Sequence, residues 1–133
     1  THIDKGSAFN TPPVSAIFVV NRTLHWLNDL GGIRVIEQRN KVKANKLYAE
    51  IERNLLFKSP IAEEDRSLMN VPFVFAEDGD EKEFLDFCTK HGLMTLKGHR
   101  SVGGFRASIY NAMPEAGVDA LVAAMREYES QHS

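Results

Sequence analysis

Two short stretches of this chain carry an apolar side chain at every second position, and longer stretches with helical periodicity surround them. In residues 69–75 and 105–110 every second side chain is apolar, which suits one face of a β-strand. Residues 93–96 form a third, shorter stretch that we also predict as a strand. Pro72 has no N–H group, which places it at an edge or an end of its strand.

Four segments are predicted to be helical, because their apolar side chains recur every three or four residues. They run from Thr11 to Gly31, over residues 33–56, from the N-cap Asp80 to Gly92, and from Pro114 onward. Thr11 is a good N-cap, and the two prolines after it tolerate a first helical turn. On the second helix, Leu47 and Leu55 belong to the apolar face, which we expect to be buried.

Short strands between longer helices predict an α+β fold, a two-layer sandwich in which helices cover a small mixed or antiparallel sheet. The predicted order is α-α-β-α-β-β-α. A chain of 133 residues is long enough for one domain with one core. We place a boundary between residues 1–32, which hold a loop and the first helix, and residues 33–133.

The composition limits the partners of the chain. Sixteen basic and eighteen acidic residues give a net charge of −2, so there is no overall attraction to nucleic acid or to an anionic membrane. No apolar run approaches the ~20 residues that a membrane-spanning helix needs. Any anion-binding site must therefore be a local cluster. Cys88, the only cysteine, lies in an apolar pattern and is predicted to be a buried, inert thiol.

Basic residues recur along the second predicted helix. They are Arg39, Lys41, Lys43, Lys46 and Arg53. Such a run can bind an anion, but a solvated helix face explains it better, and this is the interpretation that we favour.

A glycine-rich loop between two predicted strands is the first candidate site. Residues 98–106 contain three glycines together with His99, Arg100 and Arg106. Glycine permits close approach of the backbone to a ligand, and the guanidinium group of arginine matches carboxylate and phosphate. The loop is therefore either a site for a small dianion or a polar hairpin whose side chains face water. Strand alternation places Arg106 and Ser108 on the face opposite Phe105 and Ala107.

The start of the first helix is the second candidate site. The N–H groups of a helix N-terminus, beside the amide of Asn10 and the hydroxyl of Thr11, can hold a phosphate. A plain N-cap explains Thr11 as well. No metal-ligand spacing is visible around the histidines, and nothing supplies a convincing catalytic nucleophile or base.

At these two places the sequence resembles the phosphoserine aminotransferase family. Residues 97–114, KGHRSVGGFRASIYNAMP, resemble the C-terminal signature of that family, and residues 6–13, GSAFNTPP, resemble a second block. Further agreements lie between the two blocks in the family's order, at Trp26 and Leu27, Gly31 and Gly32, Arg39 and Asn40, Leu47 and Tyr48, Arg66 and Ser67, and residues 69–73. The resemblance thus covers nearly the whole chain.

The resemblance implies the small C-terminal domain of a fold-type I enzyme that depends on pyridoxal 5'-phosphate, with residues 1–32 ending the large domain. It implies a cytoplasmic homodimer that transfers an amino group from glutamate to 3-phosphohydroxypyruvate, giving phosphoserine and 2-oxoglutarate. Many bacterial members also serve vitamin B6 (pyridoxine) biosynthesis.

By position, Asn10 and Thr11 match residues that reach the cofactor phosphate of the partner subunit. Arg106 matches the arginine that binds the substrate α-carboxylate, and His99 and Arg100 match the pair that binds the distal anion. The lysine that forms the Schiff base with the cofactor lies upstream in this family, so we expect no catalytic residue in this chain and no transamination by it alone.

Two other classes of function fit the residues without the resemblance. One is a stand-alone α+β module that binds a small anionic metabolite through the glycine loop. The other is an interaction domain whose first helix, with Trp26, forms a dimer face. Replacement of Arg100 and Arg106 would abolish the first function and leave the second intact.

Overall fold

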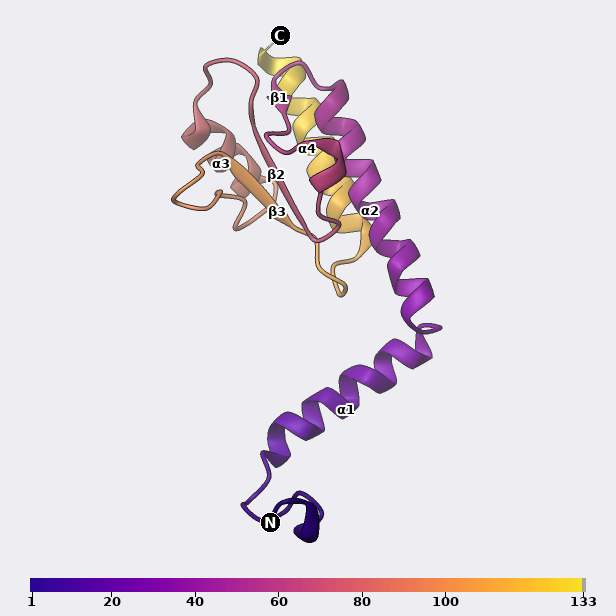
Figure 1. Ribbon diagram of the computed structural model, residues 1–133. Coiled ribbons are helices and arrows are strands. Elements are labelled where there is room, and N and C mark those ends of the chain that lie inside the picture. The colour runs from indigo at the N-terminus through magenta and orange to yellow at the C-terminus, as the bar shows by residue number, and fades with distance from the viewer. Residues whose placement is uncertain (133) are drawn as a thin grey trace. The chain divides into compact units, whose positions relative to one another are not determined.

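The computed structural model describes residues 1–132 and divides into two compact units, Thr1–Ile36 and a second unit that begins at Glu37 (Figure 1). The expected boundary after residue 32 stays a prediction. The elements in chain order are α1 (Val14–Asp29), α2 (Ile33–Arg53), β1 (Phe57–Lys58), β2 (Asn70–Phe75), α3 (Glu81–Lys90), β3 (Phe105–Ser108) and α4 (Glu115–His132), with 3₁₀ turns at Ile3–Lys5 and Glu63–Asp65.

In the first unit, α1 begins later than the sequence predicts. Its N-cap is Pro13, without a side-chain cap, so the expected N-cap Thr11 is wrong. An N-cap side chain accepts from the N–H groups two or three residues further on. For Thr11 these would be Pro13, which has no N–H, and Val14, whose N–H bonds the carbonyl of Pro12 at 2.8 Å. The predicted stop is confirmed, because Gly31 and Gly32 take φ angles of 101° and 80°.

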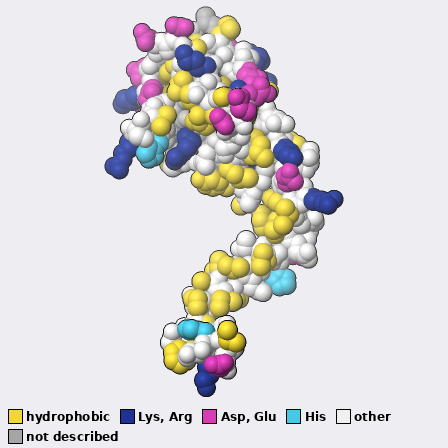
Figure 2. All heavy atoms as spheres, viewed as in Figure 1, with side chains coloured by type: hydrophobic (Ala, Val, Ile, Leu, Met, Phe, Trp, Pro, Cys, Tyr) yellow, Lys and Arg dark blue, Asp and Glu magenta, His cyan; other side chains and the backbone are white. Residues whose placement is uncertain are grey.

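The apolar side chains of α1 are exposed. No residue of this helix is buried, and the space-filling view shows hydrophobic side chains along it (Figure 2). The large exposed side chains are Val14, Ile17, Phe18, Val19, Val20, Leu24 and Trp26. A contiguous apolar surface of this kind is typical of a surface that another protein segment covers.

In the second unit, three antiparallel strands form a sheet in the order β1-β2-β3. The predictions of β2 and β3 are confirmed, and Phe73 lies opposite Phe105. The strand predicted over residues 93–96 is wrong, since Thr95 has a left-handed φ of 61° that interrupts an extended chain. Only an isolated bridge from Lys97 to Phe105 joins that region to β3. β1 was not predicted, because two residues show no periodicity.

Pro72 belongs to β2, the middle strand of the sheet, but at Pro72 only β3 lies beside it. β1 pairs with Val74 and Phe75 and does not extend as far as Pro72. On the other side Pro72 faces Arg106, whose N–H points away from β2 to the carbonyl of Leu96 at 2.7 Å. Opposite residues in antiparallel strands alternate between bonded and non-bonded pairs, and this is a non-bonded pair. The absent N–H of Pro72 therefore leaves no gap in the ladder.

The core lies between one face of the sheet and helices α2, α3 and α4, which confirms the α+β sandwich. The buried side chains of the sheet are Phe57, Val71, Phe73, Phe105 and Ala107, and those of the helices include Leu47, Ile51, Phe84, Cys88, Val118, Leu121, Val122, Met125 and Tyr128. α4 runs alongside α2 (Figure 1), and Arg53 of α2 pairs with Glu129 of α4 at 2.6 Å. Side chains on the opposite face of the sheet, such as Pro72, Arg106 and Ser108, are only partly buried.

Two predictions for α2 are wrong. The helix ends at Arg53, and Leu55 is 76% exposed. The cause is Asn54, which is buried: its amide donates to the carbonyl of Met125, and its Oδ1 accepts from the N–H of Leu56. These bonds replace the next helical turn.

Lys43 was expected on a solvated face but is only 3% exposed. Its Nζ donates to the carbonyls of Ile109 at 3.1 Å, Tyr110 at 2.7 Å and Met113 at 3.0 Å. Burial lowers the pKa of Lys43. Arg39 and Lys41 are exposed, as expected.

Two further predictions are confirmed around α3. The carboxylate of Asp80 caps this helix by accepting from the N–H groups of Lys82 and Glu83 at 2.9 and 3.0 Å. Cys88 is fully buried, and burial raises the pKa of its thiol to about 12. A thiol with so high a pKa is almost entirely protonated near neutral pH and is a poor nucleophile.

Candidate functional site

The glycine-rich loop is a closed structure held by its own backbone. The N–H of Gly98 donates to the carbonyl of Gly104 at 2.8 Å, and the carbonyl of His99 accepts from Val102 and Gly103 at 2.9 and 2.8 Å. The N–H of Gly104 also donates to Glu81 at 3.1 Å, which ties the loop to the start of α3. The loop is thus fixed at its base before β3 begins.

Only glycine fits at position 98, because the backbone of residues 103 and 104 leaves no room for a Cβ atom there. A Cβ at this position would lie 2.0 Å from the carbonyl oxygen of Gly103 and 2.7 Å from that of Gly104. Gly103 differs, because its φ is +78° but a Cβ there would meet nothing within 4 Å.

We therefore expect Gly98→Ala to lower the free energy of unfolding by about 3 kcal/mol, at the upper end of the range for overpacking, since backbone atoms must move. Gly103→Ala is the matched control and should cost about 1–2 kcal/mol, the strain of a left-handed alanine. Urea unfolding of both variants measures the difference. Equal losses would show that the contact between Gly98 and Gly103 does not restrain the loop.

His99 and Arg100 lie at the exposed end of this loop. Nδ1 of His99 is 2.6 Å from Oγ of Ser101 and also accepts the N–H of Ser101 at 3.3 Å. Among residues 1–132, no carboxylate pairs with Arg100. Both side chains are accessible to an external anion.

Arg106 lies where the loop joins the sheet, on the face of β3 opposite the core. Phe105 and Ala107 beside it are 1% and 2% exposed, while Arg106 and Ser108 are partly exposed. This confirms the predicted alternation. The Nε of Arg106 is buried and has no hydrogen-bond partner among the described residues. Buried donors are nearly always paired. The Nε of Arg66 is unpaired as well, so it is the position of Arg106 beside the glycine loop that makes its Nε a candidate donor to a ligand.

Asn10 and Thr11 belong to the first unit, so the structure does not place them together with His99, Arg100 and Arg106. Both are exposed, and within residues 1–132 neither side chain makes a hydrogen bond. Their amide and hydroxyl groups are therefore available to a phosphate, although the two prolines after them remove two of the backbone donors that a helix start usually offers.

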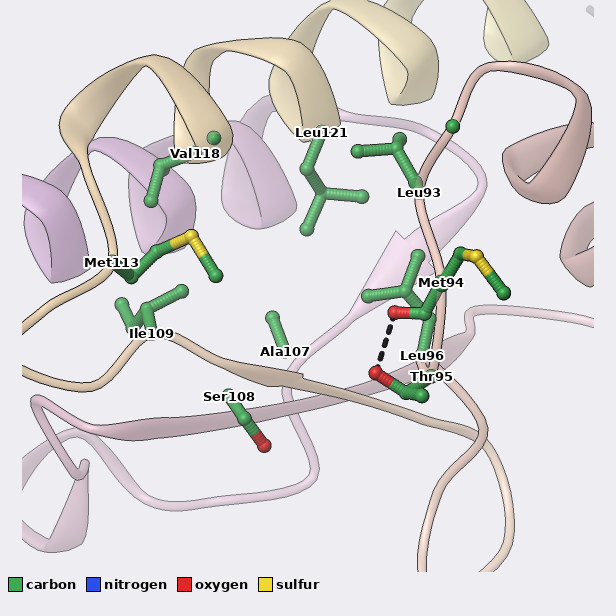
Figure 3. A pocket seen from close by; sticks show the side chains of 12 residues that line it. Leu93, Met94, Thr95, Leu96, Ala107, Ser108, Ile109, Met113, Val118 and Leu121 are labelled. Atoms are coloured by element: carbon green, nitrogen blue, oxygen red, sulfur yellow. Dashed lines mark hydrogen bonds between the residues drawn. The ribbon is translucent and has the colours of Figure 1, made fainter.

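An apolar pocket of about 230 Å³ in the second unit was not predicted from the sequence (Figure 3). It opens between residues 93–96, the end of β3 and the start of α4, with Met113, Val118 and Leu121 around it. Thr95, one of the lining residues, has a left-handed φ, and its hydroxyl donates to the carbonyl of Met94. No charged side chain lines the pocket, so it does not suit an anion.

Nowhere in residues 1–132 do three side chains of His, Cys, Asp or Glu gather as a metal ion would require. None of the helices in the same range combines the length and the apolar character needed to cross a membrane.

Comparison with known proteins gives one consistent family. The profile of the aminotransferase class-V family matches residues 1–121. The phosphoserine aminotransferase of Parabacteroides distasonis is 53% identical over 134 residues, which cover 99% of this chain and 38% of that protein. The phosphoserine aminotransferase of Nitrosomonas europaea is 49% identical over 133 residues, which cover 100% of this chain and 36% of that protein.

Solved structures agree. The phosphoserine aminotransferase of Bacillus circulans subsp. alkalophilus superimposes with a TM-score of 0.91 at 38% identity, over 100% of this chain and 37% of that one. A phosphoserine aminotransferase from Trichomonas vaginalis, with pyridoxal phosphate bound, gives a TM-score of 0.84 at 44% identity, over 94% of this chain and 36% of that one. The chain spans 36–38% of the length of these proteins.

Proposed function

This chain belongs to the aminotransferase class-V family, and we propose that it is the C-terminal part of a phosphoserine aminotransferase. The observation that carries the proposal is the buried, unpaired Nε of Arg106 at the base of the glycine loop. It occurs in a chain about half identical to phosphoserine aminotransferases over nearly its whole length. The exposed apolar face of α1 supports a larger protein that covers it.

The proposed reaction moves an amino group from glutamate to 3-phosphohydroxypyruvate and produces phosphoserine and 2-oxoglutarate. Both amino acids carry an α-carboxylate and a second, distal anion. Arg106 binds the α-carboxylate, because a planar guanidinium matches a carboxylate in two parallel hydrogen bonds. His99 and Arg100 bind the distal phosphate or carboxylate from the exposed end of the loop. These groups orient the substrate.

The cofactor of the proposed enzyme is pyridoxal 5'-phosphate, whose ring withdraws electrons from the bond that breaks at the amino-acid α-carbon. The proposed enzyme is a homodimer. In it, the amide of Asn10 and the hydroxyl of Thr11 would bind the phosphate of the cofactor in the partner subunit. The resemblance assigns the lysine that binds the cofactor to the upstream part of the protein. We therefore propose that the chain alone does not transaminate.

The biological setting is part of the same proposal. It is serine biosynthesis in the cytoplasm, with a second role in pyridoxine biosynthesis on a related phosphorylated keto acid. The shared distal phosphate of the two keto acids is the chemical basis of that second role.

The test uses full-length protein from the parent gene, purified with pyridoxal phosphate. We expect an absorbance band of bound cofactor that changes when phosphoserine is added, and 2-oxoglutarate-dependent consumption of phosphoserine. The 133-residue chain, assayed beside it, should show no turnover. A full-length protein that binds no cofactor would contradict the proposal and favour a module that only binds anions.

A further inference from the structure

The contact between Ser101 and His99 determines which ring nitrogen of His99 can donate. A backbone N–H can only donate, and the N–H of Ser101 points at Nδ1 of His99 at 3.3 Å. In this arrangement Nδ1 is the acceptor, and the Ser101 hydroxyl at 2.6 Å, which can donate or accept, then donates to the same nitrogen. Neutral imidazole carries one proton, so in neutral His99 the proton is on Nε2.

Two other histidines of the chain show the opposite arrangement. Nδ1 of His91 lies 2.9 Å from the carbonyl of Phe87, and Nδ1 of His132 lies 2.8 Å from the carbonyl of Tyr128. A carbonyl only accepts, so both of these Nδ1 atoms carry a proton. The difference is a property of the glycine loop and not of histidine in general.

The loop keeps Ser101 in place for this contact. Val102 and Gly103 both donate to the carbonyl of His99, which forms a turn around Ser101, and the bond from Gly98 to Gly104 closes the base. The ring of His99 is exposed, and its Nε2 has no partner among residues 1–132. The N–H on Nε2 is consequently the group that an incoming anion meets, next to the exposed guanidinium of Arg100.

We propose that Ser101 is a positioning residue, which holds the imidazole of His99 through Nδ1 so that Nε2–H donates to the distal anion of the substrate. The identity of that anion, a phosphate monoester or a carboxylate, rests on the proposed function. The orientation of the His99 ring does not rest on the proposed function, because it follows from the hydrogen bonds within the loop.

The arrangement is tested first, by ¹⁵N NMR of the chain labelled at histidine, at a pH where the imidazoles are neutral. Loss of a pair of ring signals in His99→Gln assigns His99. We expect Nδ1 of His99 to resonate as a non-protonated nitrogen and Nε2 as a protonated one, while His91 and His132 carry a proton on Nδ1. A protonated Nδ1 in neutral His99 would overturn the proposal.

Positioning is tested with Ser101→Ala, which removes the hydroxyl, and Ser101→Thr, which keeps it. In the chain, titration with inorganic phosphate should shift the ring signals of His99, and Ser101→Ala should raise the apparent Kd about fivefold, the value of one neutral hydrogen bond. Ser101→Thr should match the wild type. Equal affinities in Ser101→Ala and wild type, or no phosphate response at His99, would overturn the proposal.

The full-length protein provides the second readout. Ser101→Ala should raise the KM for phosphoserine about fivefold with kcat within twofold, and Ser101→Thr should restore it. A merely structural role would lower the active fraction, and so kcat, at unchanged KM, which would count against positioning. Absence of transamination by the wild type would contradict the proposed function, whereas the two NMR measurements on the chain would still decide the role of Ser101.

Discussion

Replacement of Phe84 by alanine is expected to lower the free energy of unfolding of this chain by about 3–5 kcal/mol. Phe84 of α3 has no exposed surface, and its ring centroid lies 4.8 Å from Phe57, 4.8 Å from Phe105 and 5.0 Å from Tyr128. The ring thus joins α3, the sheet and α4, and alanine would leave a cavity among rings that cannot all move inward. Urea unfolding followed by circular dichroism measures the loss.

Phe9→Ala is the matched control, because Phe9 is 54% exposed and belongs to the first unit. It removes the same atoms and should change the free energy of unfolding by about 0.5 kcal/mol or less. If Phe84→Ala cost no more than Phe9→Ala, the aromatic cluster would not be the centre of the core.

Arg106→Gln is expected to lower kcat/KM of the full-length protein for phosphoserine by about 10²-fold or more, with unfolding of the protein little changed. Truncation of one partner of a buried, hydrogen-bonded charge pair costs about 2–5 kcal/mol, and here the pair is the guanidinium with the substrate carboxylate. The fold should tolerate the change, since the buried Nε has no partner to lose among residues 1–132. Steady-state kinetics measure kcat/KM for phosphoserine, and thermal unfolding measures the stability of the variant.

Two further variants serve as controls for Arg106→Gln. Arg106→Lys keeps the charge without the planar fork, so it should recover only part of the activity. Arg39→Gln changes an exposed arginine of α2 and should leave kcat/KM unchanged. Wild-type activity in Arg106→Gln would show that the α-carboxylate binds elsewhere.

Much of the fold follows from local patterns. Helix spacing located α1 through α4, and period-two alternation located β2, β3 and the outward direction of Arg106. The failures involve features that periodicity does not record. β1 has only two residues, which are too few to show a period. Thr95 has a left-handed φ, which threonine rarely adopts, so its residue type gave no signal of this turn. The N-cap at Thr11 failed because one donor it needed belongs to Pro13, which has no N–H, and the other, Val14, donates to the carbonyl of Pro12.

Long-range contacts were also beyond sequence reasoning. Lys43 is buried because its acceptors lie 66 to 70 residues further along the chain, and only the fold brings them together. At the site, residue types indicated His99, Arg100 and Arg106, but not the contact of Ser101 with His99, which requires the geometry of the loop. The roles of Asn10 and Thr11 stay predictions.

The three hydrogen bonds of Lys43 restrict which substitutions evolution can accept at that position. A single ammonium has three N–H groups, and here each meets a different carbonyl of the chain that leaves β3. Arginine carries more donors, but they lie in one plane and spread over three nitrogens, so it cannot satisfy three acceptors converging on one point. The usual exchange of lysine for arginine should therefore be selected against at this position in homologous chains, while the exposed Lys41, two residues away on the same helix, should drift freely between the two.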